Sequence, residues 1–400
     1  MVATVHINPA LLQWARESAG LSREELADVA GIKGARGRSA EERIASWEAG
    51  ENAPTRPQLL KLAKGLMRPV TTFYLPAPPI ESDELPDFRT VANRPVDANN
   101  SVLKTFVRRM RARQDEILAL LEDDDELVEL PFIGSLPMNT PIEQLIASVR
   151  QTLDIPLARQ MQCGDKDELF RLIRNQVEKA GIFVQIQGNL GSHHTNIDPD
   201  EFRGLALASK YAPFIVINGN DAKAAHTFTL LHEIAHLWLG ESGLSNRSVF
   251  SGDVFEDGDI EAYCNRFAGD FLLPREQLLA VWASQDHGNV YQAVQVVARE
   301  LNVSRAATAH RLWKLNAIEE PQWWDLYRRY QDEWKVRRER QKEQDGGPNY
   351  YVTTKSQLGT ALISTVLGAV SDGSLSYTRA SRILGVNPHS FDGLQARLMN

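Results

Sequence analysis

Two histidines one helical turn apart, with a glutamate beside the first, are the residues of this sequence best suited to chemistry. They occur in the segment His232-Glu233-Ile234-Ala235-His236. Positions i and i+4 share one face of a helix, so both imidazoles can reach one Zn²⁺ at about 2.0–2.1 Å. Glu233 can then take a proton from a water molecule on the metal instead of binding the metal itself. The spacing therefore predicts a metal site that activates water for hydrolysis.

The third ligand has to come from elsewhere in the chain, because a catalytic zinc has three protein ligands and one position left for water. Glu261 stands 25 residues after His236, at the start of an apolar segment that must pack inward, and we predict that it is this ligand. Zn²⁺ is the default metal for two imidazoles and a carboxylate, although Mn²⁺ or Fe²⁺ can occupy the same ligands. Competing carboxylates are Glu241 and, in a Gly-punctuated acidic loop typical of solvated groups, Glu256, Asp257 and Asp259.

The hydrophobic periodicity of the sequence changes along the chain and predicts which strands and helices position these groups. Short apolar runs at 182–186, 204–208 and 214–218 predict a small three-stranded sheet. Residues 223–240, which carry the histidines, and 260–273, which begin beside Glu261, are predicted to be helices, the second ended by Pro274. We expect strand 204–208 or 214–218 to present an edge to an extended substrate peptide. By composition, candidates for a second oxyanion donor are Tyr263, His226, His193 and His194.

The first 75 residues form a different kind of module. Several short helices are predicted there, one of them opened by a capping box between Ser22 and Glu25. This segment holds 10 Lys and Arg against 8 Asp and Glu, a net charge of +2 in a chain of −8. Such a local excess suits phosphate binding, whereas base specificity needs a helix in the major groove. Candidate DNA contacts are the clustered cations Lys33, Arg36, Arg38 and Arg43.

Taken together, these motifs resemble the ImmA/IrrE-type metallopeptidases, which join a Cro/C1-type (XRE) helix-turn-helix to a minimal gluzincin. The resemblance covers about residues 180–280 strongly and 8–75 well. It implies that His232, His236 and Glu261 bind metal, that Glu233 is the base, and that a repressor protein is cleaved. The segments that carry it are Leu21-Ser22, Glu25-Leu26-Ala27, Ile44 to Gly50, Pro54-Thr55, Gln58-Leu59, Leu62-Ala63, Arg203 to Ala206, Pro213 to Asn218, Phe228 to His236, Glu261, Asn265, Phe267-Ala268 and Leu272 to Pro274.

Within the helix-turn-helix part of that resemblance, Ile44 and Trp47 are core or scaffold positions, and recognition belongs to the exposed face before them. Two later segments, 298–312 and 380–391, also have the pattern of a short helix, a turn and a second helix. Tri-helical units of this kind often serve only in packing, and we assign no DNA contacts to them.

Composition and cysteine content exclude several classes of protein. At 43% hydrophobic and 24% charged residues the chain is in the globular range. Two cysteines, Cys163 and Cys264, cannot make a disulfide framework, and without a cysteine cluster the sequence gives no sign of a thiolate metal site. Neither a signal peptide nor an apolar run long enough to span a membrane is present, so we expect a cytoplasmic protein.

These observations predict a mostly α, α+β protein: a helix-turn-helix bundle, a minimal zincin domain with a small three-stranded sheet, and a helical C-terminal region. The expected parts are 1–75, a helix-turn-helix domain; 76–101, a linker; 102–280, the zincin-like domain with preceding helices; 281–345, a helical extension; and 346–400, a C-terminal helical unit. Expected partners are DNA and a regulatory protein substrate or cognate toxin, with a possible homodimer and no membrane.

The function that follows is a zinc-dependent endopeptidase coupled to a DNA-binding domain. It would cleave a repressor or antitoxin-like protein in a stress, mobile-element or toxin–antitoxin circuit. The alternative is a DNA-binding repressor or antitoxin whose zincin domain serves mainly to bind a partner. The presence of Glu233 favours the enzyme, because a pure scaffold has no chemical need for it.

Overall fold

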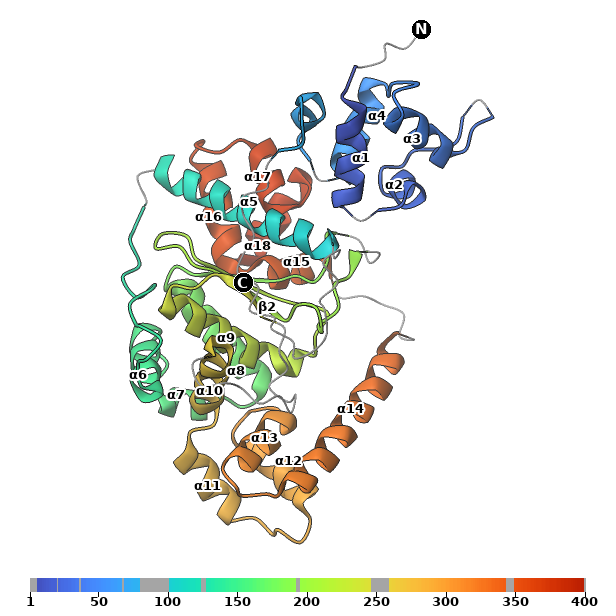
Figure 1. The fold of residues 1–400 in the computed structure, drawn as a ribbon. Helices are drawn as coiled ribbons and strands as arrows, with labels where there is room; N and C mark the ends of the chain where they lie inside the picture. The colour runs from blue at the N-terminus through green and yellow to red at the C-terminus, as the bar shows by residue number, and fades with distance from the viewer. Residues whose placement is uncertain are drawn as a thin grey trace. The chain divides into compact units, whose positions relative to one another are not determined.

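The computed structural model describes residues 6–19, 21–35, 37–66, 68–79, 101–123, 127–191, 195–245, 259–342 and 349–398. The described chain divides into two compact units (Figure 1). The first contains the described residues up to Met110, and the second contains those from Arg111 onward. Most of the expected linker, residues 80–100, lies outside the described residues.

The N-terminal unit is a bundle of short helices with a core of its own. Capping boxes open several of the helices, among them Ser22 with Glu25, as predicted, and Ser39 with Glu42. Its core includes Leu12, Leu26, Ile44, Trp47 and Leu62, all at most 4% exposed. The elements are α1 (Pro9–Ser18), α2 (Arg23–Val29), α3 (Ala40–Glu48), α4 (Arg56–Gly65) and the 3₁₀ helix η1 (Val70–Tyr74).

The second unit is built around a small mixed sheet with the strand order β1-β3-β2-β4. Its strands are β1 (Phe183–Ile186), β2 (Gly204–Leu207), β3 (Phe214–Ile217) and β4 (Gly243–Ser245). The predicted fold class, mostly α with a small sheet, is confirmed, with one strand more than the three expected. The expectation that β2 or β3 offers a free edge was wrong, because each is paired on both sides. β4, three residues long and paired with β2, forms that edge instead.

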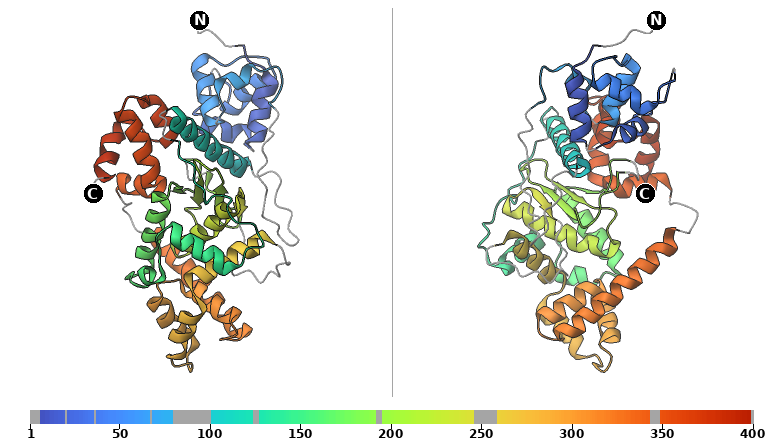
Figure 2. Two further views of the ribbon diagram at one scale, coloured as in Figure 1. Left: turned by 90° about the vertical axis from the view of Figure 1, so that its left-hand side faces the viewer. Right: turned by 45° about the vertical axis from the view of Figure 1, so that its right-hand side comes forward.

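Helix α9 (His226–Leu239) is apolar almost all round and packs against β2 and β3, as Figures 1 and 2 show. It ends at Gly240, whose φ of 76° is a left-handed conformation that favours glycine. Helix α10 (Ile260–Leu272) packs closely along α9. Helix α9 on the sheet and helix α10 on α9 therefore bring the predicted site residues within reach of one another.

The remaining helices of this unit surround that arrangement. Among those that precede the sheet, α8 packs on both α9 and β1, and the C-terminal helices α15 and α16 pack on β1. No helix among the described residues is both long and apolar enough to cross a membrane. These helices are α5 (Ser101–Asp123), which belongs to this unit from Arg111 onward, α6 (Ile142–Thr152), α7 (Leu157–Met161), α8 (Lys166–Lys179), the 3₁₀ helix η3 (Lys223–Ala225), α11 (Arg275–Ala283), α12 (Val290–Glu300), α13 (Arg305–Lys314), α14 (Glu320–Lys342), α15 (Tyr350–Leu358), α16 (Thr360–Ser371), α17 (Tyr377–Leu384), η4 (Pro388–Ser390) and α18 (Phe391–Leu398).

Candidate metal centre

Helix α9 places His232 and His236 on one face, as the i, i+4 spacing requires. Their Nε2 atoms are 3.1 Å apart. Both side chains are buried, with 4% and 1% of the residue surface exposed. Two nitrogens bound at 2.0–2.1 Å to one tetrahedral ion would lie about 3.3 Å apart. The two imidazoles are therefore spaced almost as a shared metal ion demands.

Glu261, in the first turn of α10, completes this group from the neighbouring helix. Its Oε1 lies 3.0 Å from His236 Nε2, and its Oε2 lies 3.4 Å from His232 Nε2. Only 1% of Glu261 is exposed. The structure thus brings together the three residues that the sequence singles out as metal ligands.

Asn265, one turn further along α10, fixes the orientation of the first imidazole. Its Oδ1 lies 2.9 Å from His232 Nδ1. Because an amide oxygen can only accept, this contact assigns the proton of the neutral ring to Nδ1 and leaves the Nε2 lone pair facing Glu261. A hydrogen bond from the outer ring nitrogen to a fixed acceptor is how proteins orient histidine ligands of metals.

The pKa values of His232 and Glu261 are shifted mainly by the electrostatic attraction between the imidazoles and the carboxylate. Burial alone would lower the pKa of His232, but the negative charge of Glu261 outweighs it and raises that pKa to about 9. Burial alone would raise the pKa of Glu261, but the two imidazoles lower it to about 2. Without a metal the cluster therefore holds a proton on an imidazole beside a carboxylate. A divalent cation would take the place of that proton.

Glu233 is buried between α9 and the start of the sheet. It is 0% exposed, and its Oε1 accepts a hydrogen bond from the hydroxyl of Ser245 at the end of β4. Gly204, the first residue of β2, lies so close that a Cβ there would overlap the Glu233 carboxylate. Burial raises the pKa of Glu233. Sequence reasoning missed both neighbours, because β4 is too short to give a strand pattern and Gly204 gave no sign of its contact.

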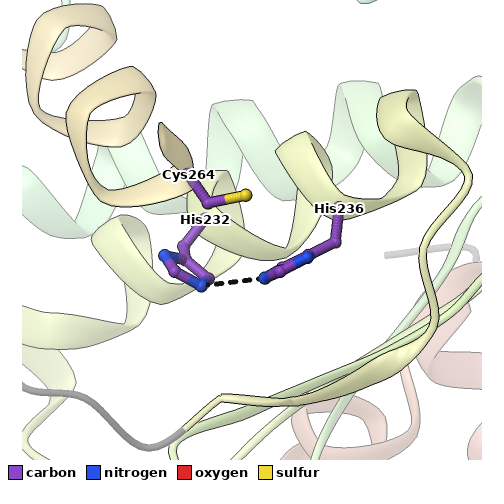
Figure 3. Close-up of side chains that lie close together, drawn as sticks. All are labelled: His232, His236 and Cys264. Atoms are coloured by element: carbon purple, nitrogen blue, oxygen red, sulfur yellow. Dashed lines mark hydrogen bonds between the residues drawn. The ribbon is translucent and has the colours of Figure 1, made fainter. Parts of the chain in front are cut away.

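Cys264 is a further group that the sequence did not point to. Its thiol lies on the same face of α10 as Glu261, and one ligand atom each of His232, His236 and Cys264 lie within 4.8 Å of one another (Figure 3). Cys264 is completely buried, and burial raises the pKa of its thiol well above the usual value. The sequence, which has no cysteine cluster, gave no sign that a thiol lies beside the predicted metal ligands.

The donor set fits a divalent cation. Two imidazole nitrogens and one carboxylate converge in a buried space, the combination that binds Zn²⁺ in catalytic sites. Within the described parts of the chain, Glu261 Oε2 and Glu233 Oε2 are buried and accept no hydrogen bond. Buried carboxylate oxygens normally have partners, so these atoms indicate a missing cationic or hydrogen-bonding species.

A cleft with a volume of about 970 Å³ reaches this centre from the surface. Beside the metal centre it is lined by His232, Ser245 and Asn265, and farther out by residues of α12, α13 and α14. Its volume is at the upper end of the roughly 300–1,000 Å³ of ligand pockets in proteins. As far as the described residues show, the centre, although buried, is therefore open on one side to a molecule of substantial size.

Among the described residues, the other carboxylates and oxyanion donors considered from the sequence lie apart from the three predicted ligands or have partners of their own. Glu241 is exposed, and Asp259 accepts a hydrogen bond from the Glu261 backbone N–H at 2.9 Å, which caps α10. Tyr263 donates its hydroxyl to Thr140 O at 2.9 Å, and His226 is buried at the first position of α9. Four further candidates lie outside the described residues: His193, His194, Glu256 and Asp257.

In the N-terminal unit the four candidate DNA contacts differ. Lys33 and Arg38 are exposed, in a loop closed by a short bridge between Ala35 and Arg38. Arg43 is half-buried, donates to Lys33 O, and has its guanidinium 5.2 Å from the centre of the Trp47 ring. Arg36 lies outside the described residues. Lys33 and Arg38 are thus exposed cations that precede α3 in the chain.

The fold and the site define two joined modules, a helix-turn-helix bundle and a zincin-like domain with a histidine-pair helix. Comparison with protein-family models agrees. Residues 178–313 match the M78 peptidase model described as an IrrE N-terminal-like domain, and residues 12–71 match a helix-turn-helix model. The chain therefore fuses an IrrE N-terminal-like domain to a helix-turn-helix domain, and the second match supports DNA binding. No curated protein matches the chain significantly.

Proposed function

We propose that this protein is a cytoplasmic metal-dependent endopeptidase whose N-terminal domain binds DNA, and that it cleaves a regulatory protein of the repressor or antitoxin type. One observation carries the enzymatic part: His232, His236 and Glu261 converge within 3.0–3.4 Å of one another, with Glu233 buried beside them. The match to an M78 peptidase model supports the same class of reaction.

His232, His236 and Glu261 would hold the metal, Zn²⁺ by the nature of the donors, with Mn²⁺ or Fe²⁺ as alternatives. When bound, the metal would polarise the scissile carbonyl and stabilise the negative charge that develops on its oxygen. Asn265 holds His232 in the tautomer that this role requires, with the Nε2 lone pair available.

Glu233 is the general base and acid of the proposal. Ser245 holds its Oε1, which leaves Oε2 to take a proton from water and later to donate it to the leaving amine. Its raised pKa suits both tasks, since a general catalyst works best with a pKa near the working pH. Gly204 has no Cβ and so leaves the room that the Glu233 carboxylate occupies beside β2.

A peptide substrate would enter through the cleft between the centre and α12–α14. The edge of the sheet beside Ser245 is β4, which pairs with β2 on one side. An extended peptide could add to this edge through backbone hydrogen bonds, which need little side-chain selectivity. This suits cleavage of a flexible segment in a regulatory protein.

The peptidase proposal is tested with Glu233→Gln and a matched control, Glu241→Gln, which alters an exposed carboxylate near the end of the same helix. Host lysate is incubated with each zinc-loaded protein, and new peptide N-termini are identified by mass spectrometry. We expect new termini with wild type and Glu241→Gln and none with Glu233→Gln, while all three retain equal zinc. Equal cleavage by Glu233→Gln would refute the base; no cleavage by any protein would favour the partner-binding alternative.

In the DNA-binding proposal the phosphate contacts come from Lys33, Arg36 and Arg38, which precede α3 in the chain, and from Arg43 within α3. Binding to duplex DNA should fall steeply with salt, and removal of one phosphate-binding side chain should reduce the slope of log K against log salt by about 0.9. Fluorescence anisotropy of the full chain with Lys33→Gln and Arg38→Gln measures this. An unchanged slope would contradict the assignment.

A further inference from the structure

The centre contains one donor atom more than the proposed function uses. Cys264 follows Glu261 by one helical turn on α10, and both side chains face α9. The ligand atoms of Cys264, His232 and His236 all lie within 4.8 Å of one another, and all three residues are buried (Figure 3). A thiolate is a strong ligand for Zn²⁺.

The second cysteine shows that burial alone does not create this arrangement. Cys163 is buried before α8, where its thiol lies 3.7 Å from Arg159 O. One ligand atom of Cys264 lies instead within 4.8 Å of a ring nitrogen of each of the two histidines. At the same centre, Glu261 Oε2 accepts no hydrogen bond from any described residue. The unsatisfied carboxylate oxygen independently indicates that a cation belongs in this space.

We propose that Cys264 is a fourth protein ligand of the metal and that the resting centre is held by two nitrogens, a carboxylate and a sulfur. This inference rests on the metal site of the proposed function. On binding, the thiol loses its proton to solvent and the thiolate sulfur bonds to the metal, so the charge on the centre falls by one.

Two consequences follow from a sulfur ligand. Four protein ligands fill a tetrahedral zinc site, whereas catalytic sites keep one position for water. The sulfur-bound form is therefore a resting state, and release of Cys264 opens the position that hydrolysis needs. A soft thiolate also selects Zn²⁺ over the harder Mn²⁺, which prefers oxygen ligands.

The test is spectroscopic and needs no substrate. The full chain is loaded with Co²⁺, and its absorption spectrum is compared between wild type, Cys264→Ala and the matched control Cys163→Ala. We expect a near-ultraviolet thiolate-to-cobalt charge-transfer band in wild type and Cys163→Ala, and its loss in Cys264→Ala. X-ray absorption of the zinc-loaded wild type should show one sulfur at about 2.3 Å, which decides the question even if Cys264→Ala does not fold.

The possible results distinguish the sulfur ligand from the metal site and from the peptidase activity. Cobalt bands in the visible without a charge-transfer band in wild type would overturn the sulfur ligand and leave the two histidines and Glu261 in place. Failure of the wild type to bind cobalt or zinc would overturn the metal site itself. A sulfur signal would support the inference whether or not the wild type cleaves a substrate, and absence of cleavage by both wild type and Cys264→Ala would count against the peptidase.

Discussion

Buried glutamates in the two units of this molecule differ in their hydrogen-bond partners. In the N-terminal unit, the side chain of Glu48 is 2% exposed and accepts hydrogen bonds from Arg16 at 2.6 Å and Arg23 at 2.8 Å. In the second unit, Glu261 and Glu233 are equally buried, yet each keeps one oxygen that accepts no hydrogen bond from the described residues. Both oxygens of Glu48 accept hydrogen bonds from arginine side chains, whereas Glu261 and Glu233 each have an oxygen without such a partner among the described residues.

The difference separates a structural ion pair from a site built for something else. Arg16 links α1 to Glu48 at the end of α3, and its Nη1 also donates to Leu21 O at 2.9 Å, so nearly every polar atom has a partner. Leaving a buried carboxylate partly unsatisfied costs free energy that a stable fold normally avoids. Where a fold contains such a group, a ligand that completes it is the simplest explanation.

Removal of the Glu261 carboxylate is expected to have the largest effect on metal binding. We expect Glu261→Ala to weaken Zn²⁺ binding by about 1,000-fold, or about 4 kcal/mol, because it removes a charged ligand and outer-shell changes alone cost 10–100-fold. Competition titration with a chromogenic chelator measures the affinity.

The control is Asp259→Ala, which removes the cap of α10 but no proposed ligand and should leave zinc affinity within about tenfold. An affinity for zinc that is the same in wild type and Glu261→Ala would show that the cluster is another structural ion pair, and the contrast with Glu48 would disappear.

The converse change tests the structural pair. Glu48→Ala leaves Arg16 without its main partner, and breaking a buried pair costs 3–5 kcal/mol. Because Arg23 is 41% exposed and can be solvated, we expect about 3 kcal/mol. Hydrogen exchange at the amides of α1 and α3 reports the loss, with no change in zinc affinity.

Glu17→Ala is the matched control, because Glu17 also contacts Arg16 but its side chain is 55% exposed. That change should alter protection by no more than about 0.5 kcal/mol. A Glu48→Ala protein as stable as Glu17→Ala would mean that the pair contributes little and that burial does not distinguish the two regions.

The sequence predicted those parts of both regions that depend on local spacing. The i, i+4 histidines, the capping box at Ser22 and the apolar helix around the motif follow from the geometry of a single helix. Glu261 was identified from the apolar segment it opens, and the structure places it beside both imidazoles. Whether it binds metal stays a prediction.

The parts that were missed depend on contacts between distant segments. Ser245 reaches Glu233 only because three residues of β4 pair with β2, and so short a strand has no readable periodicity. Cys264 looked like an ordinary apolar residue until α10 packed along α9. The pairing of Glu48 with Arg16, 32 residues away, was invisible for the same reason.

Substitution of Asn265 leaves all proposed ligands in place and should have a smaller effect on zinc affinity. Asn265→Leu removes the acceptor for His232 Nδ1, so the ring loses its fixed tautomer, and we expect a 10–100-fold loss of zinc affinity. Asn265→Asp keeps an acceptor and should stay within about tenfold of wild type. If the leucine variant binds zinc as tightly as the aspartate variant, the orientation of His232 does not depend on Asn265.

The smallest expected effect concerns His310, a buried ionisable group that stays neutral in the native protein. His310 in α13 packs between Trp313 and Trp323, with ring centres 5.5 and 5.2 Å away, and burial with the nearby charges of Lys314 and Arg311 lowers its pKa to about 3. Between pH 6.5 and 3 the unfolded chain therefore binds a proton that the native protein does not, so stability falls as the pH drops below 6.5. At pH 5.5 the loss from this residue should be about 1 kcal/mol. Urea unfolding of wild type and His310→Phe at about pH 7.5 and 5.5 measures it, and an equal pH dependence in the two proteins would show that His310 is protonated without cost in the native state.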